Sequence, residues 1–374
     1  MPLEPQNGSE KKIKRAGGTT AQRAKARKDK TRTATARKTT ARKVKESGAT
    51  ASAGSLPGPS RQTRVAVIGA GRLGSALALA LNRSGYKVIA LVARRAARAR
   101  RAARALSPRP LALDATQLDL LPDAVDLILV TTPDDQIAQV AARLAAALSS
   151  AQRAPRQPDR RPRVALHASG ALVSGALAPL GAHGFSLGSL HPLVSVSDPA
   201  NVGARNLRGA FYCLEGEARA LTAARRIVRA LGGRSFSVAA GDKSLYHAAA
   251  VIASGHTVAL FSLAAALLAR CGLSDARARR VLLPLLASTF DNLNAHAPDR
   301  ALTGTFARAD LSTVRKHLAA LQDAGDVGRG ATAVYALLGE RSLQMAARRN
   351  KFDSAVAEEI ALLLQKAISA SRNE

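Results

Sequence analysis

The sequence predicts an α/β fold: a doubly wound parallel sheet, followed by an all-helical domain and preceded by a disordered basic tail. Between residues 63 and 240, short apolar runs alternate with helical segments, which is typical of strands joined by crossover helices. From residue 241 to residue 374 only helical patterns follow. Residues 1–62 contain almost no large apolar side chains, so burial cannot offset the entropy cost of ordering them.

The α/β elements follow one another in a regular order. Strands are expected at residues 65–68, 87–92, 126–131 and 164–167, with weaker candidates at 209–214 and 234–238. Helices are expected at residues 74–84, up to residue 104, at 134–149 and at 217–231. This alternation predicts a parallel sheet with helices on both faces.

Four longer helical patterns make up the rest of the chain, at residues 242–270, 274–294, 310–322 and 334–370. The apolar stretch Ala248–Ala269 is long enough to cross a bilayer, but Ser254, Gly255, His256 and Thr257 interrupt its centre. We therefore expect a buried or interface helix and no membrane segment.

Cysteine content and the N-terminus bear on the compartment. Two cysteines in 374 residues exclude a disulfide scaffold and a cysteine-rich zinc module. No apolar core of a secretory signal follows the first residue. The expected location is the cytoplasm.

The first 60 residues are strongly basic, with nine lysines and six arginines against four acidic residues. They lack interleaved aromatic residues, which suits neutralisation of phosphates and not stacking on bases. Sequence-independent binding of nucleic acid through residues 1–60 is one interpretation. A solvated extension that binds nothing is the alternative.

A glycine-rich turn lies between the first expected strand and helix, as Gly69-Ala70-Gly71-Arg72-Leu73-Gly74. Gly69 makes the tight turn, Gly71 lets the backbone approach a pyrophosphate, and Gly74 lets helix and strand pack closely. The motif predicts a Rossmann-like dinucleotide site that includes Arg72 and Leu73. A plain strand–helix turn is the alternative.

The end of the second strand indicates which dinucleotide binds. NAD sites place an acidic residue there to hold the ribose hydroxyls, whereas this chain has Ala93-Arg94-Arg95. Arg94 and Arg95 suit a 2′-phosphate, so NADP is favoured over NAD. The alternative is a solvated basic face, because six arginines occur between residues 94 and 104.

Polar residues follow two further strands and are expected beside the cofactor, because the carboxyl ends of parallel strands share one edge. Thr131, Thr132 and Pro133 come after one strand, and Ser169 after the next. An alternative role for this first loop is capping of the following helix by Asp134. His191 closes a nearby apolar stretch and joins the candidate catalytic residues.

The helical part supplies the other candidate catalytic residues. Lys243 and His247 fall on one stripe of the helix that begins near residue 242. Arg308 and Asp310 belong to a second polar segment that leads to a helical histidine, His317. An interdomain salt-bridge cluster is the alternative for both. The seven histidines are scattered and no H-E-x-x-H motif occurs, so we expect no metal site.

These motifs together resemble a known family. A Rossmann-like domain is followed by H-x-S-G-A, L-H-P-L, K-x-L-Y-H-A-A, a T-G…A-R-x-D segment and Y-x-x-L-G. This order is similar to that of Rossmann-like proteins with the domain of unknown function 2520, over about residues 63–350. Their architecture is similar to that of pyrroline-5-carboxylate reductase, ketopantoate reductase and the β-hydroxyacid dehydrogenases.

The resemblance implies an NADP-dependent oxidoreductase that reduces a small carbonyl or imine substrate, and a homodimer formed through the helical domain. It also implies that Lys243 or His247 supplies a proton, while Arg308 binds a substrate carboxylate. A cofactor-binding regulator or scaffold without turnover, tethered to DNA by the basic tail, is the alternative. The chain departs from the family pattern at Gly255, Thr305 and Ala309. If the last position needs a positive φ, Ala309 costs stability or reshapes the loop.

Overall fold

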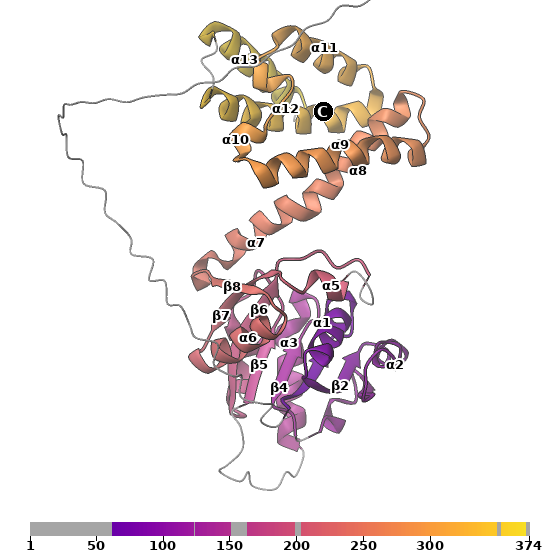
Figure 1. Cartoon of the computed structure of the whole chain (residues 1–374), viewed down its shortest axis with the longest axis vertical. Coiled ribbons are helices and arrows are strands. Elements are labelled where there is room, and N and C mark those ends of the chain that lie inside the picture. The colour runs from indigo at the N-terminus through magenta and orange to yellow at the C-terminus, as the bar shows by residue number, and fades with distance from the viewer. Residues whose placement is uncertain (1–61, 123, 151–162, 199–202, 350–352, 372–374) are drawn as a thin grey trace, which may run out of the picture. The chain divides into compact units, whose positions relative to one another are not determined.

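An eight-stranded sheet forms the α/β part of the chain, with the strand order β3-β2-β1-β4-β5-β6-β7-β8 (Figure 1). The computed structural model describes residues 62–122, 124–150, 163–198, 203–349 and 353–371. The strands are β1 (Arg64–Ile68), β2 (Lys87–Ala93), β3 (Leu111–Asp114), β4 (Leu127–Val130), β5 (Arg163–His167), β6 (Phe185–Pro192), β7 (Phe211–Gly216) and β8 (Arg234–Ser237). The central strands are almost continuously buried, as expected for a sheet with both faces covered.

Helices cover both faces of this sheet, as predicted. They are α1 (Arg72–Arg83), α2 (Ala96–Ala103), α3 (Asp134–Ser150), α4 (Ala178–Gly181), α5 (Ala204–Asn206) and α6 (Ala218–Ala230), with short 3-10 turns η1 (Leu118–Leu120) and η2 (Ser174–Leu177). One apolar core lies under α1, α2 and α6. The other lies under α3, α4 and the two 3-10 turns.

The sequence prediction missed two strands and one pairing direction. β3 has four residues, follows Pro108 and Pro110, and contains no β-branched residue, so its strand signal is weak. β6 was foreseen only as an apolar stretch, because Ser186, Gly188 and His191 interrupt it. The pair β6–β7 is antiparallel, whereas a fully parallel sheet was expected.

A series of helices follows β8 and the short turn η4 (Ala240–Asp242). They are α7 (Lys243–Val251), α8 (Thr257–Arg270), α9 (Asp275–Ala295), α10 (Pro298–Ala301), α11 (Leu311–Gln322), α12 (Gly325–Ala347) and α13 (Ser354–Ala370), with a 3-10 turn η6 (Phe306–Arg308). The expected single helix over residues 334–370 is wrong, because α12 ends at Ala347 and Asp353 caps α13 through the Ala355 amide.

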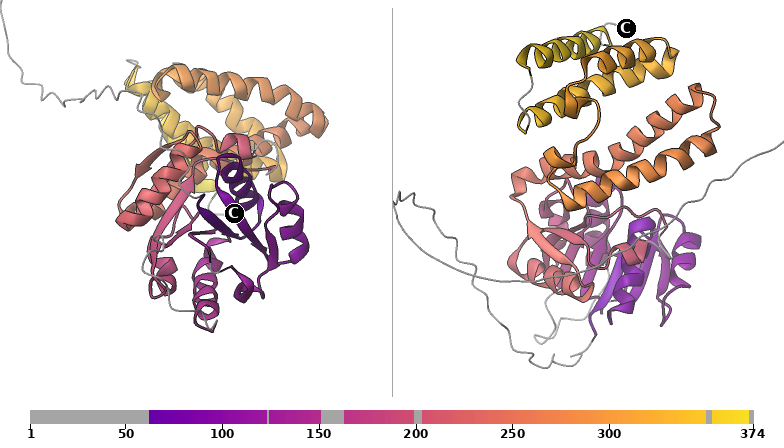
Figure 2. Two further views of the ribbon diagram at one scale, coloured as in Figure 1. Left: turned by 60° about the horizontal axis from the view of Figure 1, so that its bottom comes forward. Right: turned by 45° about the horizontal axis from the view of Figure 1, so that its top comes forward.

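The first three of these helices differ from the last three in burial. A five-residue π-helical segment, η5 (Ile252–His256), joins α7 to α8 where the sequence has its polar interruption. α8 and α9 lie side by side (Figure 2). Several of their large apolar side chains are exposed and the others are only partly buried, whereas η6, α11, α12 and α13 share an apolar core.

In the described part of the chain, one helical stretch is long and apolar enough to cross a membrane. It runs from Ala240 to Arg270, with a mean hydropathy of 1.9 and no buried residue in its most apolar window. Length and composition alone are weak evidence for a membrane span, since the core helices of water-soluble proteins meet the same criterion.

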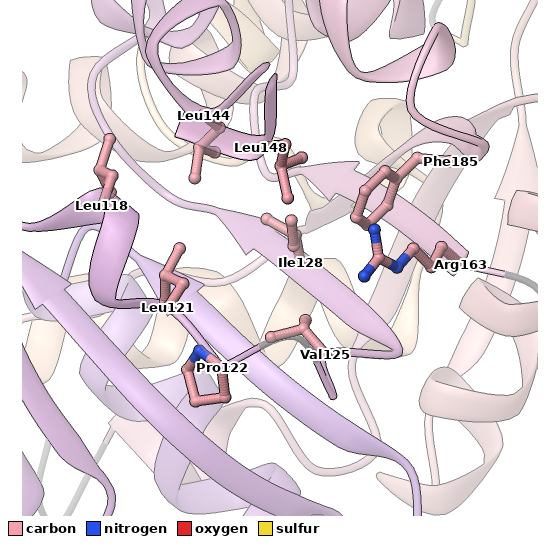
Figure 3. A pocket seen from close by; sticks show the side chains of 9 residues that line it. All are labelled: Leu118, Leu121, Pro122, Val125, Ile128, Leu144, Leu148, Arg163 and Phe185. Carbon is pink, nitrogen blue, oxygen red and sulfur yellow. The ribbon is translucent and has the colours of Figure 1, made fainter. Parts of the chain in front are cut away.

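A small void between η1, α3 and the sheet is lined by apolar side chains (Figure 3). Its volume is about 20 Å³, and the Arg163 guanidinium stacks over the Phe185 ring, 5.0 Å from its centroid, at one side. A space of this size holds no ligand. We regard it as ordinary imperfect packing of the core.

Candidate functional site

The glycine-rich turn after β1 forms a cradle for an anion. Gly69 has a φ of +110°, and a Cβ there would lie 2.7 Å from the Thr131 carbonyl carbon. A Cβ at Gly74 would lie 2.2 Å from the Gly69 carbonyl oxygen. At Gly71, by contrast, the nearest atom would be 3.8 Å away. The backbone is therefore tight on both sides of Gly71 and open at Gly71 itself, where a phosphate would need space.

The N-terminus of α1 faces this open position with unneutralised charge. Its first turn holds no acidic residue, and no side chain caps it. The amide groups and the positive end of the helix dipole are thus left for an external anion. Arg72 and Leu73 are the first two residues of this helix.

The loop after β4 lies against the cradle. The Thr131 hydroxyl donates a hydrogen bond of 2.8 Å to the Gly69 carbonyl oxygen. The Thr132 hydroxyl oxygen is buried and has no hydrogen-bond partner among the described residues. A buried hydroxyl of this kind is rare, and a bound dinucleotide would satisfy it. The residues of the cradle and of this loop therefore fit the cofactor that the sequence predicts.

Arg94 and Arg95 follow the end of β2 and are exposed. The missed strand β3 brings a carboxylate beside them, because Asp114 pairs in register with Ala93. That carboxylate is held in its own turn, where it accepts hydrogen bonds from the Thr116 amide (2.9 Å) and hydroxyl. These bonds lower the pKa of Asp114. Arg94 and Arg95 therefore remain the candidate groups for the 2′-phosphate at the end of β2.

A polar face on the antiparallel pair β6–β7 carries the second half of the site. Side chains alternate along a strand, so Ser189 and His191 lie on one face while Leu190 enters the core on the other. Across the pair, Ser189 is opposite Glu215 and His191 is opposite Cys213. The first turns of α7 cover this polar face.

Lys243 is the first residue of α7 and only 1% exposed. Its ammonium group donates to the Ser189 hydroxyl at 2.9 Å and lies 3.4 Å from the Ser169 carbonyl oxygen. Burial lowers the pKa of Lys243, and the nearby Cys213 and Glu215 partly offset that effect. Lys243 thus joins β6 to the loop after β5 inside the protein.

The loop after β5 is fixed from its other side as well. The Ser169 hydroxyl donates to an Asp134 carboxylate oxygen at 2.7 Å and accepts from the Ala171 and Leu172 amides. Asp134 lies two residues after Thr132, at the start of α3. One hydrogen bond therefore links the dinucleotide loop directly to the residue that precedes Gly170.

Two histidines meet at Gly170. A Cβ there would lie 2.3 Å from His247 Nδ1 and 3.0 Å from His191 Nε2, and the two rings pack edge to face with centroids 5.4 Å apart. The Tyr246 hydroxyl is 2.6 Å from His191 Nδ1. Burial, with smaller contributions from His247 and Lys243, lowers the pKa of His191 to about 4.

His191 is therefore neutral near pH 7. Its Nδ1 is hydrogen-bonded to the Tyr246 hydroxyl, and its Nε2 lies on the side that faces Gly170. His247 Nδ1 is buried and has no hydrogen-bond partner among the described residues. A buried side-chain nitrogen without a partner is rare, which marks His247 Nδ1 as the candidate group of this cluster for bonding to a ligand.

Arg308 and Asp310 are not joined to this cluster. Arg308 ends η6 and is exposed, while Asp310 caps α11 through the Thr313 amide (3.0 Å) and hydroxyl (2.7 Å). These bonds lower the pKa of Asp310. Neither residue forms a hydrogen bond with Lys243 or the two histidines within the described ranges.

Sequence reasoning missed several residues of this site: Gly170, Ser189, Glu215 and Tyr246. A signal was present for one of them, because Ser189 is a polar residue within an apolar stretch, and the structure shows it fully buried. Buried polar residues need partners, and Lys243 is that partner. The positions of Gly170 and Tyr246 follow only from how α7 packs on the sheet. No group of three or more potential metal-ligating side chains is found where the structure is described.

Two family models match the chain. Residues 51–192 match the Rossmann-like domain, and residues 210–342 match the domain of unknown function 2520. The combination inferred from the sequence motifs is thereby confirmed. No curated protein matches the chain.

Solved structures share the fold. A "putative NADP oxidoreductase" from Bacteroides fragilis is 23% identical, with a TM-score of 0.59, covering 76% of this chain and 98% of that one. A protein from Thermotoga maritima, TM1727, is 22% identical, with a TM-score of 0.50, covering 82% of this chain and 99% of that one. At this level of identity the similarity establishes the architecture of the chain.

Proposed function

Because the chain joins a Rossmann-like domain to a domain of unknown function 2520, we propose that it is an NADP-dependent oxidoreductase that reduces a small carbonyl or imine compound. One observation carries the proposal. The phosphate cradle at Gly71 and the histidine pair at Gly170 lie at the same edge of the sheet, linked by the Asp134–Ser169 hydrogen bond. The description of the Bacteroides structure as an NADP oxidoreductase supports the same activity.

The bound cofactor would supply the hydride, which is the difficult part of the chemistry. The protein then has to position the substrate and deliver a proton. The proton goes to the carbonyl oxygen or imine nitrogen, where negative charge develops as the hydride adds to carbon. His247 is suited to that delivery, because its Nδ1 is not engaged by the protein. His191 is neutral and presents its Nε2 on the same side of Gly170.

Lys243 would act as a positioning residue in this arrangement. Its ammonium group is buried and directed at Ser189 and the Ser169 carbonyl oxygen, away from solvent. It holds the loop that carries Gly170, against which both histidines pack. The proton-donor role that the resemblance implied for Lys243 or His247 thus falls on His247.

Arg308 would bind a carboxylate of the substrate. Its guanidinium is exposed and enters no ion pair found among the described residues. Asp310 would act indirectly, by fixing the start of α11 next to it. Arg308→Ala should raise KM for a substrate with a carboxylate and leave kcat nearly unchanged.

Cofactor preference tests the first half of the proposal. NADPH should bind at least about tenfold more tightly than NADH, because two charge-assisted contacts to the 2′-phosphate contribute about 1.5–3 kcal/mol each. Calorimetry on the full chain measures both affinities. The Arg94→Ala/Arg95→Ala variant should lose the preference, whereas Arg100→Ala/Arg101→Ala, a matched pair of exposed arginines on α2, should keep it.

Turnover distinguishes the enzyme from a cofactor-binding regulator. NADPH oxidation is followed with a panel of small aldehydes, ketones and cyclic imines, with and without a carboxylate. Binding of NADPH without turnover on any compound of the panel would favour the regulator tethered to DNA. Equal affinity for NADPH and NADH would contradict the role given to the two arginines.

We also propose that a second copy of the chain covers α7, α8 and α9. Large apolar side chains on these helices are strongly exposed, among them Leu245 (73%), Ile252 (61%), Val258 (70%) and Leu285 (64%). A surface of this kind marks an interaction site. The apolar core of the helical part is built by η6, α11, α12 and α13, so α8 and α9 contribute nothing to it.

A second copy suits this surface better than lipid does. The polar segment Ser254–Thr257 lies at the middle of the apolar stretch, where a bilayer offers no hydrogen-bond partners. A two-fold interface buries the same apolar faces on both copies at once. The homodimer that the resemblance implied is the occupant that we propose.

A further inference from the structure

A cavity of about 530 Å³ opens at the amino edge of the sheet, between α6 and the starts of β1, β4 and β5. Thr63, Asp126 and Val164 mark the beginnings of these strands, and Tyr86 precedes β2. The dinucleotide cradle and the histidine pair lie at the carboxyl edge, at the other end of the strands. The volume of the cavity at the amino edge falls within the range of about 300–1,000 Å³ that is usual for small-molecule sites.

The floor of the cavity is apolar and one wall is basic. Leu127, Val164 and Ile227 are buried and form the floor. The wall is one face of α6, where Arg219, Thr222, Ala223, Arg226 and Ile227 recur with the spacing of a helical stripe. Both arginines are exposed and enter no ion pair found in the described part of the chain.

The acidic residue at the cavity does not cancel this charge. Asp126 accepts hydrogen bonds from the Arg64 amide (2.9 Å) and from its guanidinium (3.0 and 2.9 Å). Its carboxylate is therefore already paired. Arg226 and Arg229 also lie close enough to the Tyr86 hydroxyl to oppose the rise in pKa that burial causes there. The cavity as a whole presents positive charge and hydroxyl groups above an apolar surface.

We propose that this cavity binds a small organic anion, with an apolar body on Leu127 and Val164 and a carboxylate or phosphate group held by Arg219 and Arg226. Guanidinium groups bind both kinds of anion through charge-assisted hydrogen bonds. The site is separate from the proposed dinucleotide site, since the two open at opposite ends of the parallel strands. An anion bound here leaves the cofactor position free.

Calorimetry with aromatic probes tests the site on the full chain in the presence of saturating NADPH. The probes are 2-naphthoate, 2-naphthyl phosphate and the uncharged 2-naphthamide, so that the first two distinguish a carboxylate site from a phosphate site. At least one anionic probe should bind once per chain and at least about tenfold more tightly than the amide. Equal binding of all three probes would overturn the proposal.

Substitutions locate the bound anion. Arg219→Gln/Arg226→Gln should weaken the anionic probe to the level of the amide. Arg208→Gln/Arg225→Gln removes the same charge from exposed positions that do not line the cavity, and should change affinity by less than about twofold. Equal losses in both variants, or displacement of the probe by NADPH, would contradict the site. A chain that bound the probe but no NADPH would contradict only the proposed function.

Discussion

At Gly170, two histidine side chains approach the backbone closely enough to exclude any larger residue. His247, His191 and Tyr246 come from the helix α7 and the strand β6, which are about 50 residues apart in the sequence. Ser169, next to this glycine, is held by Asp134 and by Lys243. At the residue scale, the site is thus a small polar cluster built around one loop, with a buried lysine as its support.

Lys243 and His247 should respond differently to substitution. His247→Ala should lower kcat about 100-fold or more with little change in the melting temperature, the usual scale for loss of a general acid. Lys243→Met should remove the ammonium group that donates to Ser189, leaving that hydroxyl only its longer bond of 3.4 Å to Glu215, and destabilise the fold by about 1–3 kcal/mol. Thermal unfolding and steady-state NADPH oxidation measure the two effects.

The control is Lys243→Arg, which keeps the charge. A Lys243→Met variant that stayed as stable as the parent but lost turnover would return the proton-donor role to the lysine. Unchanged kcat in His247→Ala would remove that role from the histidine.

Ala309 carries a backbone strain that a glycine would relieve. It has φ +50° and ψ +46°, and is the one non-glycine residue with a positive φ in the described ranges. The left-handed conformation costs a residue with a Cβ about 1–2 kcal/mol. The condition stated from the sequence, a positive φ at this position, is met.

Ala309→Gly should therefore stabilise the chain by about 0.5–1 kcal/mol, after the greater entropy of glycine in the unfolded chain is subtracted. Chemical denaturation measures the change. Ala307→Gly, two residues earlier in η6, is the matched control and should destabilise. A lower unfolding midpoint for Ala309→Gly would show that the Cβ of Ala309 contributes more in packing than its backbone costs.

At the scale of elements, α7 to α9 are the part of the chain that its own fold leaves uncovered. α7 begins on the sheet, through Lys243 and Tyr246. Between Leu245 and Leu293, α7, the π-helical segment η5, α8 and α9 all expose large apolar side chains. The π-helical segment at residues 252–256 changes the direction of these side chains by interrupting the regular helical turn.

Substituting this apolar surface should separate the proposed dimer. Val258→Lys/Leu285→Lys places charges where an apolar partner is expected, so the molar mass in light scattering should fall from that of two chains to that of one. Leu120→Lys, at a leucine of η1 that is 54% exposed, should leave the mass unchanged. A parent chain that is monomeric and floats with phosphatidylcholine vesicles would contradict the dimer and favour a membrane surface.

At the scale of the whole molecule, charge is distributed unevenly. The chain has a formal net charge of +30, and its first 60 residues contribute nine lysines and six arginines. All of residues 1–61 lie outside the described residues, so the predicted disorder and nucleic-acid binding of the tail stay predictions. The arginines of α2 and α6 belong to the folded part.

Deletion of residues 1–60 tests the role of the tail. Duplex DNA of unrelated sequences should bind the full chain with a strong salt dependence, because binding by neutralised phosphates releases counterions. The shortened chain should lose this binding and keep its affinity for NADPH. Filter binding at two salt concentrations measures the binding of DNA by both chains. Equal retention of DNA by the full and the shortened chain would place the interaction on the folded part instead.

The sequence by itself determined the architecture and half of the site. The runs at β1, β2, β4 and β5, and the glycine turn at Gly69–Gly74, are local patterns whose physical meaning does not depend on distant residues. Weak local signals failed, as at the short edge strand β3. The antiparallel pairing of β7 with β6 was not predicted either, because the direction of pairing depends on the path of the chain between the two strands.

Only the tertiary structure decided the role of Lys243. The spacing of Lys243 and His247 predicted a shared face, but a helix rotates its residues by about 100° each, so side chains four apart still point about 40° apart. Packing on β6 resolves that difference. It places the lysine against Ser189 in the interior and leaves His247 at Gly170. A buried ammonium group requires polar partners, and Ser189 of β6 and the Ser169 carbonyl oxygen after β5 offer them at that point.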